Sequence, residues 1–299
     1  MGEALSLWNG ETTTLRNKSV MITGSTGFIG SRLAATVPEG FEVYLPSRFR
    51  LENPEHLQTA DFIIHAAGYA APSLFMQNPI STIKVNTETT IHLLERLNPG
   101  GSFLFCSSSE VYKGLLRWAS EDDIGVTTPY HPRASYIEGK KCGETIINAY
   151  RNKGVRAMSA RIGLTYGPGT RKSDARVMNQ IIEQALTKSK IELIDDGSAT
   201  IPLCYIDDMA KMLWTALLKG TQAVYNVGSP NTMSIANLAR KIGAALNVSA
   251  DIPTAPVGAP HAKMDLTRFC SEFGPPDYTP WEEGLSATID YQKRLYGVV

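Results

Sequence analysis

A tyrosine and a lysine in one helical segment are the residues of this chain whose spacing most directly suggests proton chemistry. Tyr136 and Lys140 stand four positions apart, which places them on the same face of a helix. A positive charge near a phenol favours the phenolate, so the pair predicts a tyrosine that removes a proton near neutral pH. Ser108 and Glu110 follow an apolar run that ends at Cys106. Because parallel sheets bind ligands where their strands end, we expect these two side chains in the same site.

A glycine-rich turn near the start of the chain predicts a cofactor site. Gly24, Gly27 and Gly30 follow the apolar run 19–23 and precede a segment, 31–37, with helical spacing. Glycines at this spacing let a pyrophosphate approach the free N–H groups at a helix N-terminus, so a nicotinamide dinucleotide is the expected ligand. We expect cofactor contacts from Gly24, Thr26, Gly27, Phe28, Ile29, Gly30, Ala66, Ala67, Asn86, Tyr136 and Lys140.

The segment after the second predicted strand leaves the choice between NAD and NADP open. NAD sites usually place an acid there, which accepts hydrogen bonds from the ribose 2′-hydroxyl. Residues 45–50 contain two arginines and no acid. Ser47 and Arg48 are suited to hold a 2′-phosphate, but such arginines are equally typical of a solvated loop.

Apolar runs alternate with helical patterns over the first half of the chain. The runs lie at 19–23, 41–45, 61–65, 102–106 and 155–161, and the helical patterns at 31–37, 79–97 and 136–152. This alternation predicts an α/β fold with a Rossmann-type, doubly wound parallel sheet. Few residues separate the second run from the third, so we expect the intervening helix and strand to be shortened around 46–60.

Glycines and a proline interrupt the pattern after residue 162, and we place a domain boundary there. Residues 17–167 are expected to form the dinucleotide-binding domain. Residues 168–299 are expected to form mainly a smaller, irregular substrate-binding domain, with 203–222 returning to the first. Helical patterns continue at 176–188, 206–218 and 234–246, and 253–260 has the composition of a Pro/Ala-rich connection.

The composition excludes several classes of function. The 299 residues carry 29 Lys+Arg and 29 Asp+Glu, so no global field attracts nucleic acid or an anionic membrane. No apolar run reaches the roughly 18 residues that a membrane span requires. The four cysteines and five histidines lack metal-ligand spacing, so we expect no metal site. The scattered cysteines favour a reducing, cytoplasmic location.

These motifs together resemble the extended short-chain dehydrogenase/reductase family, in its nucleotide-sugar branch. The glycine turn, the serine run and the tyrosine–lysine pair carry the general likeness. Further matches are most similar to UDP-glucuronate decarboxylases, and they lie at 67–79, 82–87, 132–140, 165–168, 174–177, 196–200 and 204–207.

The resemblance implies an enzyme that uses NAD or NADP to oxidise the C4 hydroxyl of a nucleotide sugar. Ser108 would bind that hydroxyl and Tyr136 would take its proton. Lys140 would lower the pKa of the tyrosine and hold the nicotinamide ribose. Decarboxylation, 4-epimerisation and dehydration share the resulting 4-keto intermediate, so the resemblance predicts the first step and not the product.

The resemblance also assigns residues to the rest of the substrate. Ser109 and Glu110 fall where relatives handle chemistry at C5, although Glu110 is also consistent with a residue that merely holds a loop. Arg176 falls where relatives clamp the nucleotide diphosphate, and Tyr205 is expected beside the substrate.

Two positions depart from the decarboxylase pattern. Ile201 replaces an arginine that reaches the substrate, and the loss of charge-assisted hydrogen bonds of about 1.5–3 kcal/mol makes UDP-glucuronate a doubtful substrate. Leu164 replaces an asparagine expected near the sugar or the diphosphate.

Two other functions stay open. An NADPH-dependent reductase of a 4-keto nucleotide sugar would suit Ser47 and Arg48. The other is a family member that has lost catalysis and only binds a nucleotide. The presence of Ser108, Tyr136 and Lys140 together argues against this function, since a binding protein would not need them. Many relatives form a homodimer through a four-helix bundle, and the apolar positions within 83–97 and 137–150 suit the same arrangement.

Overall fold

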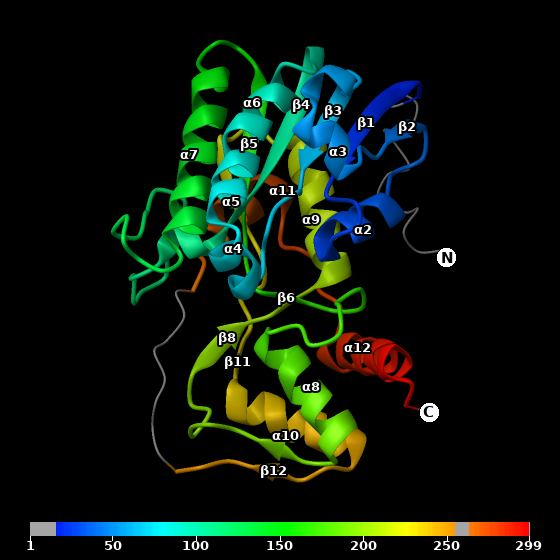
Figure 1. Cartoon of the computed structure of the whole chain (residues 1–299), viewed down its shortest axis with the longest axis vertical. Helices are drawn as coiled ribbons and strands as arrows, with labels where there is room; N and C mark the ends of the chain where they lie inside the picture. The colour runs from blue at the N-terminus through cyan, green and yellow to red at the C-terminus, as the bar shows by residue number, and fades with distance from the viewer. Residues whose placement is uncertain (1–15, 255–262, 299) are drawn as a thin grey trace.

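Six parallel strands form the central sheet of the molecule (Figure 1). The computed structural model describes residues 16–254 and 263–298. The strands are β1 (Lys18–Thr23), β2 (Phe41–Tyr44), β3 (Ala60–His65), β4 (Leu97–Ser108), β5 (Arg156–Ile162) and β10 (Val224–Val227). Their order is β10-β5-β4-β3-β1-β2, and every adjacent pair is parallel. The predicted α/β fold with a doubly wound parallel sheet is confirmed.

Alternate residues of the central strands enter two separate apolar cores. In β1, Val20 and Ile22 face one core and Met21 faces the other. The first core is covered by α2 (Phe28–Ala35), α9 (Ile206–Lys219) and α11 (Thr267–Phe273), and the second by α6 (Glu88–Leu94) and α7 (Ala134–Arg151). α5 (Pro79–Asn86) packs beside α7 (Figure 1). Burial on both faces explains why these strands are continuous apolar runs in the sequence.

The sheet ends at β2 because the next part of the chain is short. Between β2 and β3, this described stretch contains only α3 (Arg48–Glu52) and the 3-10 helix η2 (Pro54–His56). The chain therefore passes from the edge strand across β1 to β3 without building a further strand. The range 46–60, where we expected a shortened connection, contains these two short helices and no strand before β3.

The helical pattern predicted over 79–97 forms two helices, and it is confirmed except at Thr87 and at its end. α5 and α6 are separated by Thr87, whose hydroxyl donates to the carbonyl of Ile83 at 2.9 Å. The helical pattern also extends too far, because Leu97 begins β4. A short helix that begins at a proline, α4 (Pro72–Gln77), was not predicted.

The later part of the chain forms a layer beyond the carboxyl ends of the main strands (Figure 1). Its apolar core lies among α8 (Val177–Lys188), α10 (Ile235–Leu246) and α12 (Trp281–Tyr296). Three short strand pairs complete it: β6 (Thr165–Tyr166) with β9 (Cys204–Tyr205), β8 (Thr200–Pro202) with β11 (Thr232–Ser234), and β7 (Ile191–Glu192) with β12 (Ala250–Asp251).

The chain returns from this layer to the main sheet through α9 and β10. The helices predicted at 176–188, 206–218 and 234–246 are confirmed as α8, α9 and α10. α11 and α12 were not predicted. Most of the predicted connection at 253–260 lies outside the described residues.

Candidate active site

A cavity of about 370 Å³ lies where the carboxyl ends of β3, β4 and β5 meet the later layer. This volume is within the range of small-molecule sites in proteins. The parallel strands deliver their end residues to one place, as the doubly wound sheet requires. The predicted site residues found in its wall are Ile29, Ala66, Ala67, Ser108, Ser109, Glu110, Tyr136, Lys140 and Arg176.

Tyr136 lies in the first turn of α7 and is buried. Its ring stacks on Phe75, with the ring centroids 4.7 Å apart and the planes 14° apart. Burial raises the pKa of Tyr136 to about 12, a hydrogen bond with Ser108 partly offsets this rise, and the charge of Glu110 adds to it. The structure therefore brings Ser108, Glu110 and Tyr136 together.

Lys140 lies one turn further along α7 and points to the end of β4. Its Nζ donates to the carbonyl of Cys106 at 2.6 Å and lies 4.7 Å from the centroid of the Phe105 ring. Burial lowers the pKa of Lys140 to about 8. The ammonium is 5.7 Å from the centroid of the Tyr136 ring. The expectation that Lys140 lowers the pKa of Tyr136 is not met here, because burial raises this pKa and the hydrogen bond with Ser108, not the charge of Lys140, opposes the rise.

Glu110 is held in the cavity wall by an arginine that sequence analysis missed. It belongs to the 3-10 helix η3 (Ser109–Tyr112), and its N–H donates to Ser108 Oγ at 3.2 Å. Arg133 Nη1 lies 2.9 and 3.1 Å from the two carboxylate oxygens of Glu110. Arg133 also lines the cavity, from the residue before α7. Its place three residues before Tyr136 was the available signal, since it stands one helical turn from the phenol.

The turn between β1 and α2 has no room for a side chain at two of its glycines, Gly24 and Gly30. Gly24 has a φ of +70°, and a Cβ there would lie 2.7 Å from the carbonyl of Ala66. A Cβ on Gly30 would lie 2.0 Å from the carbonyl oxygen of Gly24. The first turn of α2 contains no acidic residue, so the helix N-terminus stays electropositive. This bare backbone at a helix N-terminus fits a pyrophosphate.

His65 ties the glycine turn to α5. Its Nδ1 lies 2.8 Å from Thr23 Oγ1, and its Nε2 lies 2.8 Å from the carbonyl of Val85. Thr23 Oγ1 in turn accepts the N–H of Ala67 at 3.1 Å. Burial lowers the pKa of His65 to about 3, so the ring is neutral and its Nε2–H donates to Val85. This histidine positions the turn and takes no part in the cavity wall.

The glycine-turn residues Gly24, Thr26, Gly27, Phe28 and Gly30 are not among the lining residues of the cavity, and neither are Asn86, Ser47 and Arg48. Asn86 is buried in α5, and its Oδ1 has no hydrogen-bond partner within the described chain. Ser47 and Arg48 stand at the start of α3. Arg48 pairs with Glu52 at 2.7 Å on the surface, and its guanidinium lies 5.8 Å from the centroid of the Tyr69 ring.

Arg176 lies over the glycine turn, directly before α8. Its guanidinium is 4.3 Å from the centroid of the Phe28 ring, and it makes hydrogen bonds of 2.8 and 2.7 Å to Asp174. These bonds hold the pKa of Asp174 below its usual value despite burial. The structure thus brings Arg176 to the predicted pyrophosphate turn, which also contains Thr26.

The later layer contributes apolar residues to the cavity. Ile201 and Leu164, the two departures from the decarboxylase pattern, both lie in the wall. Tyr205 is not among the lining residues; its ring packs 5.5 Å from that of Tyr166 in the core of this layer.

A second polar group lies beneath the cavity, around the end of β4. Ser107 Oγ donates to Glu144 at 2.6 Å, and Glu144 forms an ion pair of 2.8 Å with Arg161. Arg161 Nη1 donates to the Tyr112 hydroxyl at 2.8 Å, and that hydroxyl donates to Asn226 Oδ1 at 2.7 Å.

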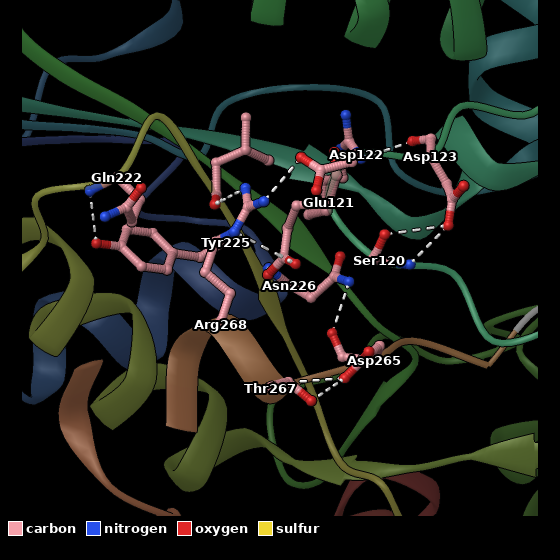
Figure 2. Close-up of polar contacts among 12 residues, drawn as sticks. Ser120, Glu121, Asp122, Asp123, Gln222, Tyr225, Asn226, Asp265, Thr267 and Arg268 are labelled. Carbon is pink, nitrogen blue, oxygen red and sulfur yellow. Dashed lines mark hydrogen bonds and ion pairs between the residues drawn. The ribbon is translucent and has the colours of Figure 1, made fainter. Parts of the chain in front are cut away.

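Asn226 extends this network to the loop after η3 (Figure 2). Its N–H donates to Glu121 Oε1 at 2.7 Å, and its Nδ2 donates to the carbonyl of Asp265 at 2.9 Å. Arg268 Nε lies 3.7 Å from Glu121 Oε2. Burial raises the pKa of Glu121. These contacts anchor Glu121, which lies within the connection between η3 and α7 that ends at Arg133.

Comparison with known proteins agrees with this geometry. The profile described as "NAD dependent epimerase/dehydratase family" matches residues 20–228, from β1 to the end of the main sheet. The chain belongs to this family. The resemblance to extended short-chain dehydrogenases/reductases is therefore confirmed, and the cradle at the glycine turn fits the dinucleotide that the family name implies.

Individual relatives point the same way. The chain is 32% identical to UDP-glucuronic acid decarboxylase 1 of Xenopus tropicalis over 305 residues, which cover 93% of this chain and 72% of the relative. The fold is similar to that of WbmF from Bordetella bronchiseptica in complex with NAD+, with a TM-score of 0.76, 22% identity and 95% of each chain covered. It is also similar to RMD from Pseudomonas aeruginosa complexed with NADPH, with a TM-score of 0.75, 23% identity, and 93% of this chain and 100% of that chain covered.

Some functional features are not found in the described part of the chain. Within residues 16–254 and 263–298, no three His, Cys, Asp or Glu side chains are grouped so as to hold a metal ion. Of the helices in these ranges, none has both the length and the apolar character needed to cross a bilayer. The four cysteines are free thiols.

Proposed function

We propose that this protein modifies a nucleotide sugar and begins by oxidising the sugar C4 hydroxyl to a ketone. The observation that carries the proposal is the convergence of Ser108, Tyr136 and Lys140 on one cavity beside the glycine turn. The identity of 32% to a UDP-glucuronic acid decarboxylase supports a nucleotide sugar as the class of substrate.

The protein's own side chains supply the proton transfer at C4. The Ser108 hydroxyl orients the sugar hydroxyl, and Tyr136 takes its proton as C4 becomes a ketone. The raised pKa makes the Tyr136 phenolate scarce at neutral pH but strongly basic. The Lys140 ammonium stabilises the negative charge on the phenolate oxygen and binds the nicotinamide ribose.

NAD or NADP would bind across the glycine turn, with its pyrophosphate at the N-terminus of α2 and contacts from Ile29, Ala66 and Ala67. When bound, the nicotinamide accepts the hydride that leaves C4 and can return it. An exposed Arg48, with no acid in residues 45–50, favours NADP over NAD. Titration of the protein with each dinucleotide measures this preference.

We assign Glu110 to proton transfer at C5. A 4-ketone acidifies the hydrogen at C5, and Glu110 lies beside Tyr136 in the same wall. When the C5–H bond breaks, the proton passes to the carboxylate and the electron pair passes into the enolate of the ketone. Ser109 would contact the same part of the sugar, and Arg176 would hold the diphosphate at the glycine turn.

A substrate panel tests the proposal. The protein is incubated with UDP-, dTDP-, CDP- and GDP-sugars and with NAD or NADP, and the products are analysed by mass spectrometry. Loss of carbon dioxide indicates decarboxylation, loss of water indicates dehydration, and an unchanged mass with a new retention time indicates epimerisation. The proposal fails if no sugar in the panel reacts or reduces the cofactor.

A reductase of a 4-keto nucleotide sugar is the second candidate, and the exposed Arg48 favours it because reductases of this type use NADPH. The two candidates differ in cofactor balance. The first regenerates its cofactor in every cycle, whereas the reductase consumes one NADPH for each product molecule.

We also propose a homodimer formed through α5 and α7, which pack side by side. Ile80 and Ile83 on α5 are 65% and 42% exposed, and Cys142 on α7 is exposed. A second copy would bury these positions in a four-helix bundle. Sedimentation of the wild type and of Ile83→Glu tests this: the substitution should weaken the dimer.

Two organisational assignments complete the proposal. Residues 17–167 bind the cofactor, and residues 168–299 mainly bind the sugar nucleotide. Residues 203–222 return to the first domain, and the packing of α9 on the main sheet supports this return. A cytoplasmic location is supported by the four free thiols, which suit a reducing compartment.

A further inference from the structure

The loop between β6 and α8 carries Arg176 and has little regular structure of its own. Residues 167–176, all of them described, form no helix or strand. Gly167, Gly169 and Ser173 have φ values of 140°, 109° and 54°. A serine at positive φ persists where surrounding contacts hold it there. The place of Arg176 therefore depends on the elements that pack against this loop.

The last turns of α12 provide such contacts. The Tyr291 hydroxyl donates to the Thr170 carbonyl at 2.8 Å, and the Ser173 N–H donates to the Tyr296 hydroxyl at 2.8 Å. Gln292 Nε2 donates to Thr170 Oγ1 at 2.6 Å. α12 lies beside α8, the helix that follows the loop (Figure 1). This helix therefore anchors the loop at two points along its length.

Gln292 differs from the two tyrosines because it is buried and has a second partner. It is 1% exposed, although glutamine is a residue type that is seldom fully buried. Its Nε2 also lies 3.3 Å from Asn179 Oδ1. The amide nitrogen thus donates one hydrogen to Thr170 and the other to Asn179. Because Asn179 Oδ1 accepts this bond, the Nδ2 donor of Asn179 is directed away from Gln292.

Asn179 links Gln292 to the arginine over the glycine turn. It lies in α8 and lines the cavity. Burial raises the pKa of Asp174, but hydrogen bonds from Arg176 and Asn179 outweigh this effect and hold that pKa below its usual value. Asp174 accepts bonds from Nε and Nη2 of Arg176, which leaves Nη1 without a hydrogen-bond partner in the described chain. A series of hydrogen bonds, Gln292–Asn179–Asp174–Arg176, therefore runs from α12 to a guanidinium that can still donate to a ligand.

We propose that Gln292 is a positioning residue for the diphosphate of the substrate. It fixes the amide of Asn179 and thereby holds Asp174 and the Arg176 guanidinium in place over the glycine turn. The proposal rests on the proposed function, in which Arg176 holds the diphosphate. Gln292 does not line the cavity and stands 113 positions from Asn179 in the sequence, so it acts on the ligand only through the series.

Binding of nucleoside diphosphates tests this role. Calorimetry on the cofactor-loaded wild type compares UDP, dTDP, CDP and GDP, and the tightest of them is the probe for the variants. Gln292→Met removes the amide and keeps a side chain of similar length, so the affinity should fall by about 3- to 10-fold, the effect of roughly one hydrogen bond. The matched control is Ile289→Val, which loosens the packing of the same helix in the apolar core but leaves the series intact. Its affinity should stay within about 2-fold of the wild type.

Double-mutant cycles separate positioning from a general loss of structure. Arg176→Ala alone should weaken binding by about 10- to 100-fold. In the Arg176→Ala background, Gln292→Met should change the affinity by less than about 2-fold, because its route to the diphosphate is gone. Asn179→Ala interrupts the series but keeps the bond from Gln292 to Thr170. Adding Gln292→Met to Asn179→Ala should likewise cause less than about 2-fold further loss.

The outcomes distinguish this proposal from the proposed function. Wild-type affinity in folded Gln292→Met, or full additivity in either cycle, overturns the role of Gln292 and leaves the proposed function intact. If Gln292→Met does not fold, Asn179→Ala decides alone, since unchanged affinity in that variant also overturns the series. If none of the four nucleoside diphosphates binds the wild type, the proposed function itself fails.

Discussion

Two carboxylate–guanidinium pairs flank the end of β4, and they differ in what surrounds them. The Glu144 and Arg161 side chains are 10% and 4% exposed, and Arg161 also donates to Tyr112. The Glu110 and Arg133 side chains are 27% and 34% exposed, and both face the cavity. The first pair is enclosed by the fold, whereas the second is open to a ligand.

The difference separates residues that hold the site from residues that act in it. Ser107 and Ser108 are adjacent in β4, so their side chains leave opposite faces of the strand. Ser107 bonds to the buried pair and Ser108 to the phenol. Substitutions in the buried Glu144–Arg161 pair should therefore change the free energy of unfolding. Substitutions of residues that face the cavity should change the rate of the reaction.

The largest expected effect is on the cavity side. Tyr136→Phe removes the proton acceptor at C4 but keeps the ring that stacks on Phe75. We expect the rate of C4 oxidation to fall by about 100- to 10,000-fold. Denaturant unfolding should show a change of less than about 1 kcal/mol in the free energy of unfolding. Activity close to that of the wild type would contradict the assignment.

Breaking the buried Glu144–Arg161 pair should lower the free energy of unfolding more than breaking the more exposed Glu110–Arg133 pair. Arg161→Met leaves Glu144 charged and without its partner, so the free energy of unfolding should fall by about 3–5 kcal/mol. Arg133→Met breaks the more exposed pair and should cost about 1 kcal/mol or less. Urea unfolding of both variants measures the contrast, and equal losses would show that the two pairs do not differ in this way.

The pH dependence of kcat/KM tests the roles of the two titrating residues in the cavity, Tyr136 and Lys140. The active protonation state has a Tyr136 phenolate, with a pKa of about 12, and a Lys140 ammonium, with a pKa of about 8. Below pH 8 the lysine stays charged and the phenolate fraction rises about 10-fold per pH unit. Above pH 8 the loss of the ammonium cancels that rise, so log kcat/KM should level off. In Lys140→Met the break near pH 8 should disappear, and its persistence would assign it to another group.

The smallest effect concerns an arginine remote from both pairs. The Arg48 side chain is 70% exposed at the start of α3, the short helix after β2. If its guanidinium binds a 2′-phosphate, Arg48→Ala should weaken NADP binding by about 10-fold and leave NAD binding unchanged. Fluorescence titration with both dinucleotides measures this. Equal effects on the two would show that Arg48 belongs to a solvated loop.

The sequence was most informative where local pattern determines position. The strands, the glycine turn and the Tyr136–Lys140 spacing follow from periodicity and backbone sterics over a few residues. Arg133 was missed because its partner, Glu110, lies 23 residues away and meets it only in the folded chain. The pKa of Tyr136 was anticipated in the wrong direction because burial, which dominates it, depends on packing that spacing does not reveal.

The most direct test of the central claim is to mix cofactor-loaded protein with its nucleotide sugar and follow the absorbance of the reduced nicotinamide. Oxidation at C4 predicts that reduced cofactor forms early, decays as product accumulates and shows no net consumption, and that Tyr136→Phe prevents its formation. Product formation with no reduced nicotinamide at any time, or unchanged reduction in Tyr136→Phe, would contradict the account.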